Sequence, residues 1–328
     1  MKFGRVIACA FLVLGAPAQA ADLLSIFRLA QTADAVYAGA RASWAAAQEK
    51  VPQGRAGLLP QASLTATTQY NDRNLSFRAP VQPLVNSPFN SNAITLSITQ
   101  PILRRQNALA YEQAKSQVTQ ADAVFAQAAQ DLIVRVSQAY FDVLLAQDNV
   151  ALANAQKAAI SQQLEQAKRN FEVGTATITD THEAQARYDL TVSQEIAAQN
   201  DLEIKRRTLE QIIAVAAPTL APLNTRLQLK PPEPARVDVW VEEARRENLQ
   251  VKAAEVGVTF AAQTVERNRA GHLPTLDAVA SYSDTAQGAG VQTSVGFETK
   301  TKAIGLQLAI PIYQGGLVNS QVREALAN

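Results

Sequence analysis

The sequence predicts a mainly helical chain with a smaller β component: long antiparallel coiled-coil helices, plus four strands of a transmembrane β-barrel, encoded as an internal duplication. Three observations support this prediction. The motif Arg-Ala-Gly-x-Leu-Pro occurs twice, two alternating strand-like runs follow each copy, and a long tract without glycine or proline separates the copies. An internal period of this length indicates one structural unit written twice.

Four prolines mark the boundaries of the repeated strand pairs. Pro60 and Pro274 close the two copies of the motif, and Pro101 and Pro311 stand at the ends of the strand pairs that follow. The interval from Pro60 to Pro274 and the interval from Pro101 to Pro311 have nearly the same length along the sequence. Because the copies stay in step, we predict that all four prolines lie at junctions between strand and helix.

The N-terminus predicts a cleavable export signal over residues 1–20. Lys2 and Arg5 form its positive end, and Ala18-Gln19-Ala20 supplies a small-residue cleavage site. The alternative is a membrane anchor, but the apolar run is shorter than the roughly 20 residues that a spanning helix needs. The single cysteine, Cys9, lies inside the signal. The mature chain is therefore expected to have no disulfide and no lipid-bearing cysteine.

The segment before the first strand pair is expected to be helical from Asp22 to about Ala56. Two interruptions are predicted in it, an early break near Asp34 and another at Pro52, where the ring disturbs the last turns.

The first predicted strand pair spans residues 60–101, and the second spans residues 274–311. In each pair, apolar and polar residues alternate over runs of roughly ten residues, the length of a tilted membrane strand. Residues 71–92 contain three prolines and several asparagines, which predicts a loop. In the second pair, the glycine-rich Gln287–Gly290 is expected to be a hairpin tip.

Each predicted strand has one apolar face, and two interpretations are open. A water-soluble sandwich would cover this face with a core, whereas a transmembrane barrel would turn it toward lipid and line water with small polar residues. The polar faces consist of Ser, Thr, Gln, Gly and Ala, and no complementary apolar layer occurs elsewhere in the chain, which favours the barrel. Single-chain barrels start at about eight strands, so four strands would have to be shared between subunits.

From about residue 106 to residue 170 the chain has neither glycine nor proline, which predicts a helix of about 100 Å. Its apolar residues recur at alternating steps of three and four, the heptad spacing of coiled coils. They are Val118, Ala121, Phe125, Ala128, Leu132, Val136, Ala139, Val143, Ala146, Val150 and Ala153. A flanking series widens this stripe, and a wide stripe favours a ring of helices over an isolated pair. That series is Val124, Leu144, Ala151, Ala155 and Ala158.

The long helix is expected to turn at Val173-Gly174-Thr175 and to return as a second helix from near Asp180 to about Val215. Gly174 is predicted as a left-handed C-cap, and Thr179 or Asp180 as the cap of the returning helix. Residues 218–236 contain five prolines and are predicted as an extended connector.

No motif for catalysis or metal binding is found. The two histidines, His182 and His272, stand in different positions of the repeat, and no HExxH or GxSxG pattern occurs. Acidic and basic residues are interspersed at a net charge of +1, which does not favour a nucleic-acid partner. We expect no enzyme activity, no cofactor and no metal.

Together these features resemble the TolC-type outer-membrane efflux and secretion channels over essentially residues 22–328. The resemblance rests on Pro101 and Pro311, on the long helix, and on the hairpin tip. The tip reads Phe171-x-Val173-Gly174-x-x-x-Ile178-Thr179-Asp180, and the similarity continues through Ala184-x-Ala186-x-Tyr188-Asp189.

The resemblance implies a homotrimer in which each chain gives four strands to one twelve-stranded barrel in the outer membrane, embedded in its lipid. The helices would continue into the periplasm as a tapering tunnel, an α-barrel. There a periplasmic adaptor protein and an inner-membrane transporter would dock, and drugs or secreted proteins would pass without chemistry. On this pattern Thr179 and Asp180 are expected to lock the entrance, and Gly174 to Ile178 to face the adaptor.

The implied domain order is a first repeat over residues 21–217, with its helical hairpin at 102–217, then the connector at 218–236, called equatorial in the family, and a second repeat over 237–328. The family's second repeat also carries a long hairpin, so we expect that the printed chain is truncated within that helix. One alternative is a periplasmic adaptor of an export system, with a coiled-coil hairpin and a β domain. A purely structural coiled-coil bundle would leave the repeated strands unexplained.

Overall fold

The computed structural model describes residues 20–75, 85–224, 231–289 and 295–328. The body of the predicted export signal, residues 1–19, lies outside the described residues. The rest forms two compact units, each assembled from two stretches of the chain: residues up to 40 with 128–235, and residues 41–127 with 236–328. The architecture is mainly helical with four antiparallel strands, as predicted.

The longest element is α4 (Arg105–Glu172), a continuous helix of 68 residues. At 1.5 Å per residue it is about 100 Å long, which confirms the length expected from the tract without glycine and proline. Every member of the predicted heptad stripe is buried or half-buried. The flanking series differs, because of its five members only Leu144 is buried and the other four are exposed.

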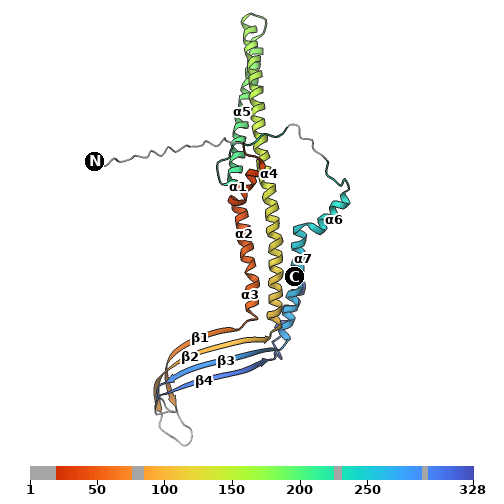
Figure 1. The fold of residues 1–328 in the computed structure, drawn as a ribbon. Coiled ribbons are helices and arrows are strands. Elements are labelled where there is room, and N and C mark those ends of the chain that lie inside the picture. The colour runs from red at the N-terminus through yellow and green to blue at the C-terminus, as the bar shows by residue number, and fades with distance from the viewer. Residues whose placement is uncertain (1–19, 76–84, 225–230, 290–294) are drawn as a thin grey trace, which may run out of the picture. The chain divides into compact units, whose positions relative to one another are not determined.

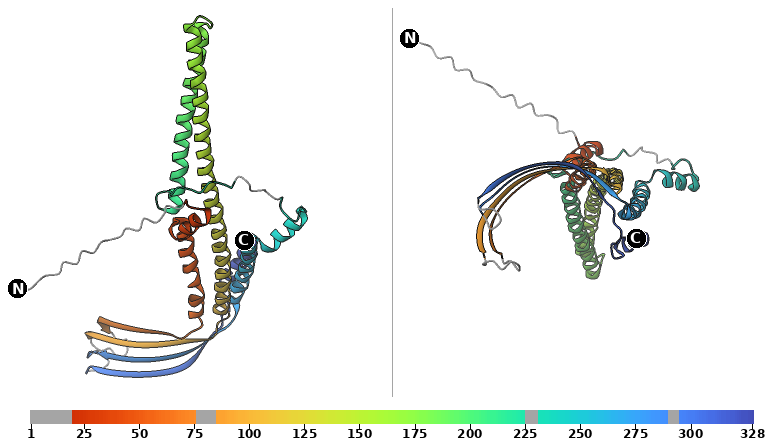
Figure 2. Two further views of the ribbon diagram at one scale, coloured as in Figure 1. Left: turned by 45° about the horizontal axis from the view of Figure 1, so that its top comes forward. Right: turned by 90° about the horizontal axis from the view of Figure 1, so that it is seen from below.

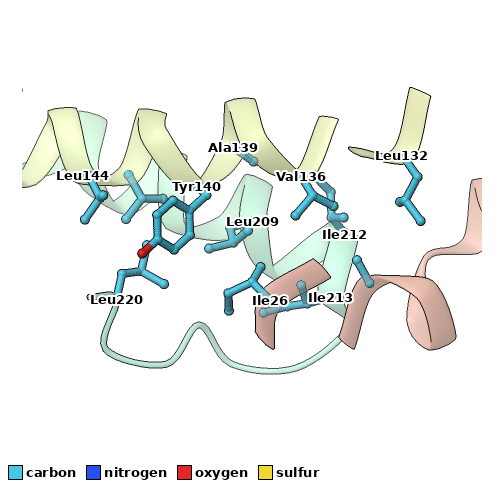
Figure 3. Packing of buried hydrophobic residues seen from close by; sticks show 12 residues of the cluster. Ile26, Leu132, Val136, Ala139, Tyr140, Leu144, Leu209, Ile212, Ile213 and Leu220 are labelled. Carbon is cyan, nitrogen blue, oxygen red and sulfur yellow. The ribbon is translucent and has the colours of Figure 1, made fainter. Parts of the chain in front are cut away.

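In the first unit, α5 (Ile178–Ile213) runs antiparallel to the C-terminal part of α4 (Figure 1). Helix α1 (Leu23–Ala33) contacts α5. Residues of α1, α4, α5 and the connector form one hydrophobic core (Figure 3). Its buried residues are Ile26, Ala30, Leu132, Val136, Ala139, Tyr140, Val143, Leu144, Leu209, Ile212, Ile213 and Leu220.

The start of the described chain is joined to the connector by a short parallel bridge between Ala21 and Leu220. The amide of Ala21 donates to the carbonyl of Thr219 at 2.8 Å, and the amide of Ala221 donates to the carbonyl of Ala21 at 3.0 Å. The hydroxyl of Tyr140, on α4, donates to the carbonyl of Ala221 at 2.9 Å. One buried aromatic side chain therefore ties the long helix to this bridge.

The predicted break at Asp34 is confirmed, because α1 ends there and α2 (Ala35–Gln48) begins one residue later. Asp34 is only 4% exposed and accepts two hydrogen bonds from the guanidinium of Arg135, at 2.8 and 2.9 Å. The amide of Tyr37 also donates to the same carboxylate, at 2.6 Å. The break is therefore held by an ion pair between the buried Asp34 and the half-buried Arg135 of α4, as well as by the cap of α2.

The second predicted interruption was misplaced. The chain breaks at Glu49, and Pro52 lies in the first turn of α3 (Lys50–Ala56). Proline is tolerated there because the amides of the first helical turn have no partner inside the helix.

In the second unit the four strands form one antiparallel sheet in the order β1-β2-β3-β4. Their bounds are β1 Gln61–Leu75, β2 Val85–Leu103, β3 Thr275–Gln287 and β4 Phe297–Ala309. Figure 2 shows that the sheet curves into an arc. The strands, at 15, 19, 13 and 13 residues, are longer than the runs of roughly ten that the alternation predicted.

The predicted loop over 71–92 was largely wrong. Residues 71–75 belong to β1 and 85–92 to β2, while 76–84 lie outside the described residues. Pro88 pairs with Asp72 of β1, but the pairing of β2 with β3 begins only at Ser91. β2 is thus an edge strand at Pro88, where the missing N–H is accepted.

The helices of the second unit adjoin the strands in sequence. They are α3, the first part of α4, α6 (Val237–Glu247), α7 (Leu249–Arg269), a short 3-10 turn over Ala270–His272 and α8 (Leu317–Ala327). None of the helices in the described ranges combines the length and the apolar character needed to cross a membrane.

Candidate functional site

The hairpin tip joins α4 to α5 by a backbone turn that satisfies the end of each helix. Gly174 has φ +76° and stands just after α4. Its amide donates to the carbonyl of Phe171 at 3.0 Å, and the amide of Thr175 donates to that of Asn170 at 2.8 Å. These two bonds form a Schellman motif, which confirms Gly174 as the left-handed residue after the helix.

The cap of α5 is Thr177, which corrects the prediction of Thr179 or Asp180. The amide of Asp180 donates to the Thr177 hydroxyl at 3.3 Å, and the amide of Thr177 donates to Oδ2 of Asp180 at 2.8 Å. Asp180 is therefore the third residue of a capping box. The sequence held the signal, since a threonine three residues before an acidic residue is the spacing of this motif.

The capping box also favours the charged form of the Asp180 carboxyl group. Donation from the backbone amide of Thr177, and then from its hydroxyl, holds the pKa of Asp180 below its usual range. The Asp180 carboxylate is thus committed to its own helix through Oδ2, while the side chains of Ile178 and Thr179 are exposed beside it.

At the first junction, Pro60 immediately precedes β1, and Pro101 lies near the end of β2, shortly before α4. The Gln100 amide spans the junction, donating to the carbonyl of Leu58 at 3.0 Å and to that of Pro101 at 2.7 Å. The side-chain amide of Asn107, on α4, donates to the carbonyl of Gly57. Side-chain amides from β2 and from α4 therefore both bond to the backbone turn between α3 and β1.

The second junction repeats part of this arrangement. Pro274 immediately precedes β3, and Pro311 lies just after β4. The amide of Gln314 donates to the carbonyl of Gly271, the glycine of the second motif, at 3.5 Å. His272, to which no sequence motif assigns a role, lies 3.1 Å from the side-chain oxygen of Asn319 on α8.

An ion pair at the β2–β3 junction was missed by the sequence reasoning. Arg104, between β2 and α4, donates from Nε and Nη2 to the two carboxylate oxygens of Asp277, with the first contact at 2.8 Å. Asp277 is buried although it lies on the polar face of β3. A bulge in the pairing between Pro101 and Leu103 accompanies this contact.

The two faces of the sheet differ as the alternation predicted. On the polar face, hydroxyl groups bond across strands: Ser63 with Ser97 at 2.7 Å and Thr95 with Ser283 at 3.2 Å. The other face carries apolar side chains on all four strands. They include Leu64, Tyr70, Ile94, Leu96, Ile98, Tyr282, Ile304, Leu306 and Leu308, all exposed except the half-buried Tyr282. Among the described residues no group of His, Cys, Asp and Glu is arranged to hold a metal ion.

Comparison with known proteins identifies the family. The chain matches the model described as "Outer membrane efflux protein" over residues 35–215 and 240–328. It is 35% identical over 308 residues to outer membrane protein TolC of Vibrio cholerae serotype O1, covering 93% of this chain and 68% of that protein. It is 33% identical over 317 residues to the proteases secretion protein PrtF of Dickeya chrysanthemi, covering 95% and 68%.

The fold has solved counterparts. The Campylobacter jejuni CmeC outer membrane channel superposes with a TM-score of 0.77 at 17% sequence identity, covering 93% of this chain and 64% of that one. This likeness is one of fold, whereas the two relatives share sequence over most of this chain. The helical hairpin, the four-stranded sheet and these similarities together show that the chain belongs to the outer membrane efflux protein family.

Proposed function

We propose that three copies of this chain assemble into one outer-membrane channel, each giving four strands to a twelve-stranded barrel and its long helices to a periplasmic duct. As a family member the chain is an outer-membrane channel protein of efflux or type I secretion. The relatives support the channel and give no support to the adaptor alternative. What we propose beyond family membership is the trimer, the shared barrel and the docking partners.

The observation that carries the proposal is the curved sheet with an uncovered apolar face. Its contacts within the described chain are overwhelmingly between its own strands. A soluble sandwich would need a second layer over Ile304, which is 91% exposed. In a membrane, lipid would cover this face and the hydroxyl-rich face would line water. The outer edges of β1 and β4 would then pair with other copies, because open edges do not occur in the hydrocarbon region.

The helices support a duct because they too have an uncovered apolar surface. Beside the buried stripe, α4 presents exposed apolar residues, among them Val124, Ile133, Leu145 and Leu152. Helices of neighbouring copies would cover them in a ring. At the end of the hairpin, the exposed Phe171, Val173 and Ile178 form the surface that we propose for a periplasmic adaptor, which would couple the channel to an inner-membrane transporter.

The duplication is supported by the register of the two hairpins. Gln61 pairs with Thr99 in the first hairpin, and Thr275 pairs with Ala309 in the second. Gln61 and Thr275 each directly follow the proline that closes their copy of the motif, and Thr99 and Ala309 each stand two positions before the proline at the end of their strand pair. We therefore propose that residues 21–217 and 237–328 are two copies of one unit, joined by the connector at 218–236.

The assembly is tested by producing the chain in a Gram-negative host and fractionating the membranes. We expect it in the outer membrane, with heat-modifiable migration, a trimer as the largest product of lysine cross-linking, and stepwise conductance in liposomes. A soluble periplasmic monomer would contradict the proposal.

A separate experiment tests the proposed gate at Thr179 and Asp180. Asp180→Ala should raise the conductance of the reconstituted channel. Thr177→Ala is the matched control, because it removes the same helix cap and keeps the carboxylate. Equal effects of the two substitutions would mean that Asp180 only caps α5. An exposed ionic contact contributes about 0–1 kcal/mol, so a gate of this kind would open at modest cost.

A further inference from the structure

The free edges of the sheet belong to β1 and β4, and every described side chain on these two strands is exposed or nearly so. We propose that β4 of one copy pairs antiparallel with β1 of the next in one defined register, with Lys302 opposite Asp72 of the partner copy. This rests on the proposed assembly and adds the residues that join the copies.

The register follows from the β2–β3 pairing inside the chain. Because the registers of the two hairpins match, each position of β4 corresponds to one of β2, and each position of β1 corresponds to one of β3. Within the chain Thr95 of β2 pairs with Ser283 of β3. Gly305 is the β4 counterpart of Thr95, and Gln69 is the β1 counterpart of Ser283. The same pairing between copies therefore places Gly305 opposite Gln69 of the next copy.

The alternation of the strands agrees with this register. Ile304 then lies opposite Tyr70, and Leu308 opposite Ala66, so apolar side chains of the two copies share one face of the sheet. Lys302 and Asp72 lie on this same face, two residues beyond Ile304 and Tyr70. A slip of one residue would place the apolar side chains of one strand beside the polar ones of its neighbour.

Charge complementarity supports the same pairing. The register brings Lys302 opposite Asp72, both of which are exposed in the single chain. Within the chain, the corresponding positions of the β2–β3 pair are Asn92 and Ala286, which carry no charge. Opposite charges directly across a pair of strands favour pairing, so this contact supports the proposed seam between copies and has no counterpart at the corresponding positions of the β2–β3 pair.

The groups around the pair leave Lys302 available for it. On its own sheet, Lys302 faces Tyr282 of β3, while the neighbouring Lys300 lies 3.6 Å from Asp284. Asp72 faces Pro88 of β2, and the adjacent Arg73 guanidinium lies over the Phe89 ring at 5.3 Å.

Paired cysteines test the register, because the only natural cysteine, Cys9, lies in the predicted export signal. Directly opposite Cα atoms are about 4.5–5.5 Å apart, within the reach of a disulfide, whereas a slip of two residues carries them beyond about 7 Å. Two adjacent pairs are needed, because opposite pairs alternate between the wide and the narrow type. They are Gly305→Cys with Gln69→Cys, and Leu306→Cys with Thr68→Cys.

The full chain is oxidised in outer membranes and resolved without reductant. We expect the predicted pairs to give at least fivefold more cross-linked dimer and trimer than two slipped controls, Gly305→Cys with Thr67→Cys and Gly305→Cys with Asn71→Cys. Gly305→Cys alone should give none. If the parent chain is trimeric by lysine cross-linking but a slipped pair reacts best, the register is overturned and the proposed assembly stands. If the parent chain is monomeric, both are overturned.

A charge exchange tests the ion pair independently. Lys302→Glu and Asp72→Lys should each at least halve the fraction of trimer that survives mild heating in detergent, and the double variant should recover most of it. Lys50→Glu, on α3, controls for the change of net charge. Losses that simply add in the double variant would overturn the pairing of Lys302 with Asp72.

Discussion

Gly174 shows how a single backbone angle shapes the hairpin tip. Its φ of +76° is unfavourable for a residue with a Cβ, although a Cβ there would meet nothing within 4 Å. We expect Gly174→Ala to destabilise the hairpin by about 1 kcal/mol, from the conformational cost alone. Guanidinium-induced loss of helical circular dichroism in detergent measures it. Gly174→Asn should cost less, because asparagine tolerates this conformation. An unchanged alanine variant would contradict the argument.

The Asp34–Arg135 pair is a second contact at the scale of residues. Hydrogen bonds from Arg135 hold the pKa of Asp34 below its usual range. A carboxyl group whose pKa is lower in the folded state than in the unfolded state stabilises the protein at pH values above its unfolded-state pKa. This stabilisation is lost as the pH falls through the folded-state pKa. This contribution should therefore disappear only below about pH 4.

Removing one partner leaves the other charge without its ion pair. We expect Asp34→Asn to cost about 2 kcal/mol at neutral pH, less than for a fully buried pair because Arg135 is 36% exposed. The same denaturation experiment measures the loss. Glu183→Gln breaks the exposed Glu183–Arg187 pair and should cost about 0–1 kcal/mol. Similar losses from the two variants would mean that burial does not strengthen the Asp34 contact.

At the scale of elements, replacing either of two helical glycines by alanine is expected to change the stability of the protein in opposite directions. A Cβ on Gly54, in α3, would lie 2.9 Å from Cβ of Ala114 and 3.2 Å from Cα of Tyr111, both on α4. A Cβ on Gly39, in α2, would meet nothing within 4 Å. We expect Gly39→Ala to stabilise the protein by about 1 kcal/mol. Gly54→Ala should destabilise it, because α3 would have to move away from α4. Thermal unfolding followed by helical circular dichroism measures both signs.

The sequence predicted the elements best where a pattern extends over many residues. The heptad spacing of α4 continues over many turns, so its stripe was predicted residue by residue. The sequence predicted which face each residue of a strand occupies, but it did not predict the lengths of the strands. Prolines and asparagines such as those near Pro88 normally indicate a loop. Here they lie in a strand, because β2 is unpaired on one side at Pro88. The pairs Arg104–Asp277 and Asp34–Arg135 join residues 173 and 101 positions apart. No local pattern connects such residues, so these contacts could not have been predicted.

At the scale of the whole molecule, the two faces of the sheet should respond differently to charge. A lysine at Ile304 would place a second ammonium group on the apolar face, beside Lys302. A lysine facing lipid costs about 2–4 kcal/mol at the middle of the membrane and less toward its surfaces. A lysine at Gln307 would face the water-filled interior. We expect Ile304→Lys to reduce the heat-modifiable form in outer-membrane fractions, and Gln307→Lys to leave it unchanged. Equal tolerance of both would contradict a lipid-facing apolar surface.

The bridge between Ala21 and Leu220 has a consequence for the time course of folding. Ala21 stands at the start of the first repeat and Leu220 just after its end, in the first residues of the connector, yet the two lie side by side against Tyr140. During synthesis Ala21 therefore has no partner until the connector has been made, so this unit cannot close in the order in which its residues emerge. Contacts of such long sequence separation form slowly. The helical hairpin of α4 and α5 can pair earlier, and the first residues after the predicted signal would dock last, as the step that completes the unit.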